Sequence, residues 1–291
     1  MARLDPVVDH VELARRSLVT LHGAEPLVYA LFTVAFMKQV AVPTMARILH
    51  RRGTGDIVTQ TLQRNDDTIV VLGQLLDHGP GSQVGRAWID RLNAIHAHFP
   101  LRDADSLYTL STLALDPHAL TEALGASPFD AAEREAQWLF WRDVATLQHL
   151  QDVPDDADGL RLWALAYEDA EWAPSEDGRQ VARALVQAFG ERCLPRAARP
   201  LAPRVISAFC PPRLREVHGL PEPGRVVDLL VRVGLRAYVA TVDVRRVPLE
   251  RSLARAFGDD RHGVRPPEDV GSRRRPTLTP DALDGGRPRR G

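Results

Sequence analysis

The feature that most constrains the fold of this chain is a continuous apolar run from Pro26 to Val42. It spans seventeen residues, and its only charged residue is Lys38. A helix that crosses a membrane needs ~20 apolar residues, so this run is too short to favour a spanning segment. We expect a helix that is buried in a protein core or lies against a membrane surface. We expect no signal peptide, because Asp5, Asp9 and Glu12 interrupt the N-terminus before any apolar stretch.

Signals for helices recur along the rest of the chain, and no stretch alternates with period two between hairpin turns. Asp130 and Glu133 have the spacing of a capping box, which predicts a helix from there to about Leu150. Two more helices are expected over residues 158–172 and 176–193, and a buried helix over Val226 to Tyr238, where apolar residues are nearly continuous. Residues 196–212 are rich in arginine and proline and are expected to form a connecting loop or a broken helix.

The chain is expected to form one all-α domain. Its 291 residues could hold two domains by length alone, but no linker divides the interior. We expect a lead helix in residues 1–25, a catalytic domain over 26–258 and a disordered tail over 259–291. The tail is rich in Arg, Pro, Gly and Asp and has few bulky apolar residues.

A histidine on an apolar helix face is the strongest candidate for a ligand site. His96 shares a face with Leu92, Ile95 and Phe99, because positions three and four apart are neighbours on a helix. His98 lies on a more polar side, so one helix cannot direct both imidazoles at the same metal ion. A neutral imidazole in a dry pocket is what the axial position of a haem requires. A core histidine bonded to a carbonyl would give the same pattern.

A second candidate lies upstream, where Arg64 and Thr68 are four residues apart and point the same way on a helix. Apolar residues at helical spacing from Thr54 to Leu76 predict a helix pair or one interrupted helix. A guanidinium can pair with a carboxylate through two hydrogen bonds. Because the chain holds thirty-six arginines, Arg64 could equally be an ordinary surface residue. Asp67 could be a functional carboxylate or a solvated charge.

Together these segments resemble a family of haem-dependent oxygenases that includes fungal mycophenolic-acid-pathway oxygenases and bacterial latex-clearing proteins (rubber oxygenases). The resemblance covers roughly residues 26–245 and is sharpest over 38–155. In the family pattern a histidine precedes a polar turn with Asp and then the string Leu-Tyr-Thr-Leu, which here spans Leu107 to Leu110. The resemblance implies that His96 is the proximal iron ligand and that Thr109 lines the pocket.

The chain departs from its latex-clearing relatives at one position. There, an arginine is followed after two residues by a lysine, the second axial ligand, and then a threonine; here Asp67 stands in place of that lysine. The chain has a single lysine, Lys38, so a haem capped by lysine is not expected. The resemblance implies that Arg64 pairs with a haem propionate. It makes Arg64, Asp67, Thr68 and Thr109 the candidate catalytic residues, with Asp67 able to accept a hydrogen bond from an iron-bound water.

Composition and missing motifs remove several other function classes. A net charge of −1 and a pI near 6.8 give no reason to expect nucleic acid. Cys193 and Cys210 are too few for a disulfide framework and suit a reducing cytosol, so we expect a cytoplasmic protein. No Cys-x-x-Cys-His motif occurs, so a haem would be bound non-covalently. The motifs of zinc proteases, di-iron bundles, nucleotide-binding folds and serine hydrolases are also missing.

The resemblance therefore implies a globin-like helical core around haem b, with O2 as co-substrate and a hydrophobic small molecule as substrate. Family precedent favours oxidative cleavage of an isoprenoid-type C=C bond to carbonyl products. We expect no transmembrane segment and at most a peripheral membrane contact. Two other functions stay open: a haem or apolar-ligand binding protein without turnover, and a scaffold that has lost its cofactor.

Overall fold

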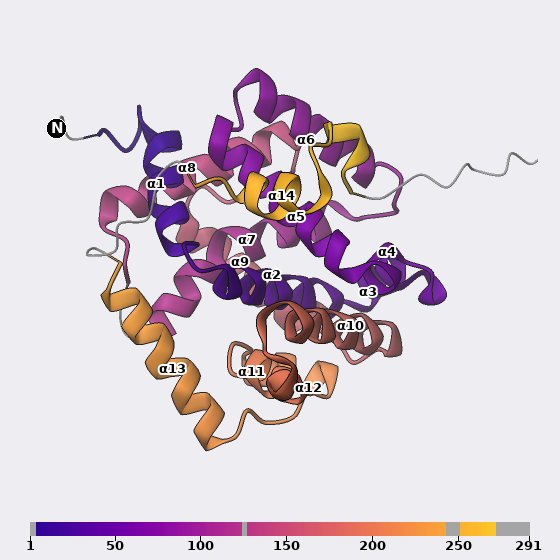
Figure 1. The fold of residues 1–291 in the computed structure, drawn as a ribbon. Coiled ribbons are helices and arrows are strands. Elements are labelled where there is room, and N and C mark those ends of the chain that lie inside the picture. Colours follow the sequence, from indigo (N-terminus) through magenta and orange to yellow (C-terminus); the bar gives the residue numbers. More distant parts are fainter. Residues whose placement is uncertain (1–3, 124–126, 243–250, 272–291) are drawn as a thin grey trace, which may run out of the picture.

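The long apolar run of the sequence forms the central helix of the fold, α2 (Glu25–Val40). Every residue of α2 from Leu27 to Val40 is buried except Lys38. The helices α7 (Asp103–Ala123) and α10 (Glu176–Cys193) both pack against it (Figure 1). Of the two expectations for this run, the structure shows the buried helix.

The one charged residue within the buried stretch of α2, from Leu27 to Val40, is neutralised inside the protein. Lys38 Nζ lies 2.6 Å from Asp116 Oδ1 on α7 and 3.3 Å from Glu168 Oε1 on α9 (Ala157–Glu171). Burial disfavours the charged amine, but the two carboxylates outweigh it and raise the pKa of Lys38. Buried charges persist in proteins only when they are paired in this way. The ion pairs therefore connect the central helix to α7 and α9.

The structure, a computed structural model, describes residues 4–123, 127–242 and 251–271, and in these ranges it has helices and no strand. It is an all-α, single-domain fold, and one hydrophobic core contains residues from Ala14 to Val270. The remaining helices are α1 (His10–Leu21), α3 (Pro43–His50), α4 (Asp56–Thr59), α5 (Thr61–His78), α6 (Gln83–His96), α8 (Ala131–Leu147), α11 (Ala202–Ser207), α12 (Pro212–His218), α13 (Arg225–Ala240) and α14 (Asp260–His262). Short turns of other helix types are η1 (Arg51–Gly53), η2 (Arg196–Leu201), η3 (Arg255–Asp259) and η4 (Pro267–Asp269).

Most helices predicted from the sequence are present. Asp130 accepts a hydrogen bond from the Glu133 backbone, and the Glu133 side chain accepts one from the Asp130 backbone, so α8 begins with the expected capping box. The helices expected at 158–172 and 176–193 are α9 and α10. The run from Thr54 is the interrupted pair α4 and α5, which is broken at Gln60. Residues 196–212 form the broken helix η2 and α11.

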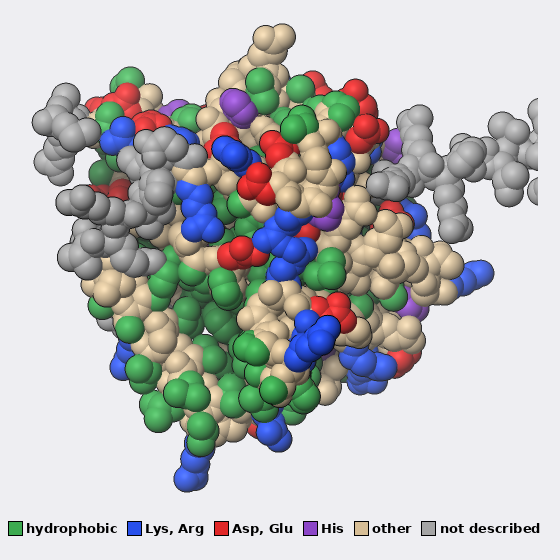
Figure 2. Space-filling view, in the orientation of Figure 1, with side chains coloured by type: hydrophobic (Ala, Val, Ile, Leu, Met, Phe, Trp, Pro, Cys, Tyr) green, Lys and Arg blue, Asp and Glu red, His purple; other side chains and the backbone are tan. Residues whose placement is uncertain are grey.

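α13 corrects one prediction. We expected a buried helix here, but Val239 is its only buried residue. Val226, Leu229, Leu230 and Val233 are each more than half exposed. They recur at the spacing of one helix face, and Figure 2 shows apolar side chains along this part of the surface. A nearly continuous apolar run does not distinguish a helix buried on all sides from one whose apolar face points outward.

The lead helix is part of the domain and not a separate element. Ala14 and Leu18 of α1 belong to the main core, and α1 packs along α8. No single described helix is long and apolar enough to cross a membrane. Within the described ranges, one pair of helices, α1 and α2, reaches that length and composition together, with a bend of 105° between them.

The C-terminal segment corrects a second prediction. Residues 272–291 lie outside the described residues, but residues 259–271, expected to be disordered, pack against the body next to α5. The preceding turn enters the core with Leu253, Ala254 and Phe257. It lies so close to α5 that a Cβ on Gly73 would be 2.3 Å from the backbone nitrogen of Ala254. Only glycine permits this approach.

Charged groups fix the rest of this segment. Arg265 Nη2 donates to Asp67 Oδ1 at 2.6 Å, and the backbone nitrogen of Gly271 donates to Asp67 Oδ2 at 3.0 Å. His262 Nε2 lies 2.8 Å from Asp66 Oδ2, which also accepts from Arg192 at 2.6 Å. The segment has few bulky apolar residues, but it is held mainly by the buried carboxylates of Asp66 and Asp67 on α5, which its composition does not reveal.

Removing residues 259–271 should lower the stability of the domain. We expect a chain that ends after Gly258 to melt about 4 °C or more below one that ends after Gly271, because Asp67 would lose both of its partners. Thermal unfolding followed by circular dichroism measures the difference. The chain that ends at Gly271 is the control for residues 272–291. Equal melting temperatures would show that the segment contributes nothing to stability.

Candidate functional site

The candidate site is a pocket enclosed by α2, α3, α5, α6, α7 and α8. It holds about 1340 Å³ of empty space, including its opening to solvent. Its walls are mostly apolar, with aromatic side chains from α2 and α8, and Val270 and Gly271 of the C-terminal segment complete one side. An apolar pocket with a few polar groups is typical of sites for small molecules and cofactors.

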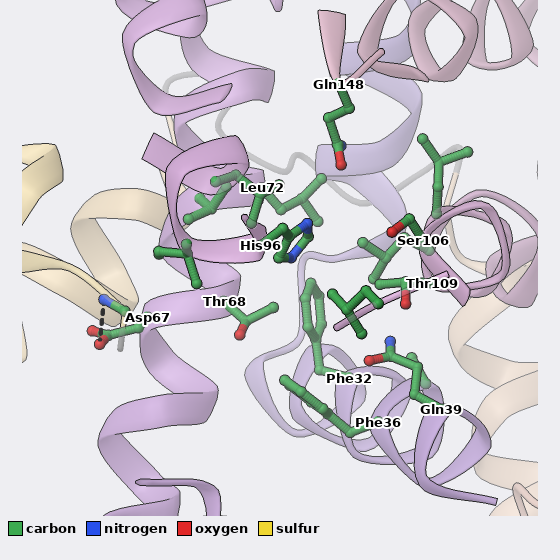
Figure 3. Close-up of a pocket in the computed structure, with 18 of the residues that line it drawn as sticks. Phe32, Phe36, Gln39, Asp67, Thr68, Leu72, His96, Ser106, Thr109 and Gln148 are labelled. Atoms are coloured by element: carbon green, nitrogen blue, oxygen red, sulfur yellow. Dashed lines mark hydrogen bonds between the residues drawn. The ribbon is translucent and has the colours of Figure 1, made fainter. Parts of the chain in front are cut away.

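His96, the last residue of α6, points into this pocket (Figure 3). Leu92, Ile95 and Phe99 line the pocket beside it, as the helical spacing predicted. Among the described residues its imidazole has no hydrogen-bond partner, so the carbonyl-bonded core histidine is not what is seen. Burial, and then the charge of Arg64, lower the pKa of His96 to about 4. The ring is therefore neutral at pH 7 and has a nitrogen lone pair available.

The second histidine of the His-Ala-His string is placed differently. His98 Nδ1 bonds the backbone oxygen of Ala94 at 2.6 Å, and the residue is exposed to solvent. It does not line the pocket. The helical register thus separates the two imidazoles, as the sequence predicted.

Arg64 and Thr68 line the pocket from α5, one helical turn apart. Arg64 Nη1 donates to Thr68 Oγ1 at 2.8 Å, and the guanidinium lies 5.8 Å from the centre of the Phe36 ring. Burial lowers the pKa of Arg64, but a guanidinium stays protonated in proteins. No carboxylate of the described residues forms an ion pair with it, so its charge is available to an anionic group in the pocket.

Asp67 is not the open carboxylate that the sequence suggested. It borders the pocket, but both of its oxygens are engaged by the C-terminal segment, one by Arg265 and the other by the backbone of Gly271. Figure 3 shows it directed toward that segment, whereas Thr68 points to the interior. Successive residues of a helix point about 100° apart, which explains the difference. Asp67 therefore holds the C-terminal segment in place at the wall of the pocket.

The wall opposite α5 carries hydroxyl and amide groups from three helices. Thr109 of α7 lines the pocket as expected, and its Oγ1 donates to the backbone oxygen of Asp105. Sequence reasoning missed Ser106, Gln39 and Gln148, which also line the pocket. Ser106 precedes Thr109 by three residues, so helical spacing could have identified it. Gln39 and Gln148 gave no such signal.

These residues fit a haem better than a bare metal ion. Among the described residues no group of three or more His, Cys, Asp or Glu side chains could hold a metal by itself. A haem needs only one protein ligand, because the porphyrin supplies four nitrogens. His96 offers that ligand as a neutral imidazole, and Arg64 offers a guanidinium that a propionate can pair with.

Comparisons with known proteins identify the family of this chain. Residues 19–244 match the sequence family described as "ER-bound oxygenase mpaB/B'/Rubber oxygenase, catalytic domain". The chain is 23% identical over 164 residues to the ER-bound oxygenase mpaB of Penicillium roqueforti (strain FM164), which covers 51% of this chain and 55% of the relative. It is 22% identical over 208 residues to the ER-bound oxygenase mpaB' of Penicillium brevicompactum, which covers 65% of this chain and 49% of the relative.

A solved structure shares the fold. The latex clearing protein LCP in its closed state superposes with a TM-score of 0.56 and 18% sequence identity, over 85% of this chain and 73% of that one. The present chain spans about half the length of the curated relatives it matches. Since the family match covers most of its residues, this chain belongs to the family of ER-bound oxygenases of the mpaB and mpaB' type and rubber oxygenases.

Proposed function

We propose that this protein is a haem b-dependent oxygenase that uses O2 to oxidise a hydrophobic small molecule. The observation that carries the proposal is the imidazole of His96, which is neutral, unbonded among the described residues and directed into an apolar pocket. The family supports the oxygenase class, because its members are named for that activity. The free thiols of Cys193 and Cys210 favour a cytoplasmic location.

Each residue of the site then has a defined task. His96 would hold the iron, and Arg64 would pair with a propionate while Thr68 accepts its hydrogen bond and fixes its orientation. Haem b, when bound, supplies the activation of O2. The apolar walls exclude water and bind an apolar substrate, and Thr109 and Ser106 offer hydroxyls that can orient it. We propose oxidative cleavage of an isoprenoid-type C=C bond as the reaction.

Absorption spectroscopy and oxygen uptake test this function. The purified protein supplied with haem should show a Soret band and a pyridine haemochrome of b type. With an isoprenoid alkene it should then consume O2 and form carbonyl products. A protein that binds no haem under these conditions would overturn the proposal.

A haem or apolar-ligand binding protein without turnover is the second candidate. The observation in its favour is Asp67, because both oxygens of its carboxylate are already engaged by Arg265 and Gly271 and it is not an open acid or base in the pocket. Haem binding without O2 uptake, across a panel of alkenes, would favour this function over the oxygenase.

Replacing His96 and His98 one at a time should show which of the two histidines binds the haem iron. We expect His96→Ala to give a folded, largely colourless protein, because the iron loses its only ligand from α6. His98→Ala should keep its Soret band, because His98 lies outside the pocket. Absorbance at equal protein concentration measures the haem content, and circular dichroism checks the fold. Loss of colour in His98→Ala alone would show that the ligand was assigned to the wrong residue.

Two substitutions on α5 should distinguish a residue that binds haem from a residue that holds the C-terminal segment in place. Arg64→Gln should weaken haem binding about tenfold or more, because a charge-assisted hydrogen bond contributes about 1.5–3 kcal/mol. Asp67→Asn should leave haem binding nearly unchanged but lower the melting temperature by several degrees, because Arg265 would stay buried without a carboxylate. Haem titration and thermal unfolding measure the two effects. The reverse result would assign the anchoring role to Arg64 and the binding role to Asp67.

A further inference from the structure

A second cavity continues the line of the pocket along α7 and α8. It holds about 660 Å³ of empty space, including its opening to solvent. On α7, residues between Ser106 and Leu113 line the pocket, and residues from Ala114 onward line the second cavity. On α8 the same change occurs at Trp141. The two spaces therefore lie end to end beside the same two helices.

Trp141 lies where the two spaces meet. It is the only described residue that lines both spaces, and its side chain is 4% exposed. A smaller cavity that is also lined by Trp141 shares Phe32, Leu72 and Leu113 with the pocket. Phe140 packs edge-on at 5.4 Å and holds the indole in place. The indole of Trp141 therefore lies at the junction of the two spaces.

The two spaces differ in chemistry. The pocket is apolar near Trp141, with Leu110, Leu113 and Val144 beside it. The second cavity combines apolar lining, from Ala114, Leu115 and Trp138, with polar side chains, among them His118 and Gln137. The Gln137 side chain is 1% exposed, and its Oε1 has no hydrogen-bond partner in the described part of the protein.

We propose that Trp141 limits the length of the apolar chain that the pocket accepts, and that the second cavity is the space it closes off. The proposal rests on the apolar substrate class proposed above. A chain that reaches the indole cannot extend further, so the protein discriminates between short and long apolar chains at this residue. Each methylene buried in an apolar site contributes about 0.8 kcal/mol, or about fourfold in affinity. In a series of ligands that differ only in chain length, the limit should therefore appear as the length beyond which affinity stops rising.

The experiment measures the dissociation constants of straight-chain primary alcohols by isothermal titration calorimetry, on the haem-loaded protein where haem is bound and otherwise on the protein as purified. For the unaltered protein, affinity should rise with chain length and then level off. For Trp141→Ala it should keep rising for at least two further methylenes, so that the longest alcohols bind about tenfold more tightly than to the unaltered protein. Trp141→Phe should show a smaller extension, and because it keeps an aromatic ring in the core it disturbs folding less than Trp141→Ala does.

Two controls test the geometry. Trp138→Ala removes an indole from the same helix that lines the second cavity only, so the levelling-off length should not change. Adding Ala157→Phe to Trp141→Ala should refill the second cavity and restore the original limit, because Ala157 lines that cavity and not the pocket. The same levelling-off length in the unaltered protein and both Trp141 variants overturns the proposal. So does an extension that Ala157→Phe leaves intact, since the gained space would then lie elsewhere.

Because the readout is binding and not turnover, the result is separate from the proposed function. A shifted limit in a protein that consumes no O2 would support the role of Trp141 and contradict the oxygenase. Alcohols that bind to none of the variants would overturn the role of Trp141 by removing its premise, an apolar ligand in the pocket.

Discussion

The burial of α2 on every side sets the positions of the helices that build the pocket. A helix whose apolar residues cover its whole circumference is stable in water only when neighbours enclose it, and here α7, α10, α3 and α5 do so. Phe32, Phe36 and Gln39 lie on the face that meets the pocket. The ion pairs of Lys38 then fix how α7 lies against α2, and with it the wall that carries Thr109.

α5 joins the chemistry of the site to the stability of the domain. One side of the helix presents Arg64 and Thr68 to the pocket, and the adjoining side offers Asp66 and Asp67 to the C-terminal segment. Both carboxylates are buried, and burial raises the pKa of Asp66 against the opposing effects of His262 and Arg192. The negative charges of Asp66 and Asp67 must therefore be balanced by positive charges from outside α5. The segment that supplies it, through Arg265, also brings Val270 and Gly271 to the pocket wall.

Much of the fold followed from local patterns. The capping box at Asp130, the interruption before Thr61 and the position of His96 all depend on residues within one or two helical turns, which a sequence displays directly. Predictions failed where the answer depended on distant partners. The sequence does not show that Asp67 contacts a residue 198 positions away, or that the apolar face of α13 is exposed among the described residues. No local pattern singles out Trp141, because only the packed structure shows that it lines two cavities.

The contact between Asp67 and Arg265 also bears on the order in which the molecule is made. A ribosome adds about 5–20 residues per second, so on the order of 10–40 s pass between synthesis of the carboxylate and synthesis of its guanidinium. During that interval α5 carries two acidic groups without their partners from the later segment, and one wall of the pocket does not exist. A nascent chain in which α2 to α10 have formed thus still lacks the side of the pocket that Val270 and Gly271 complete. A ligand that contacts Val270 and Gly271 therefore binds late, after most of the domain has already left the ribosome.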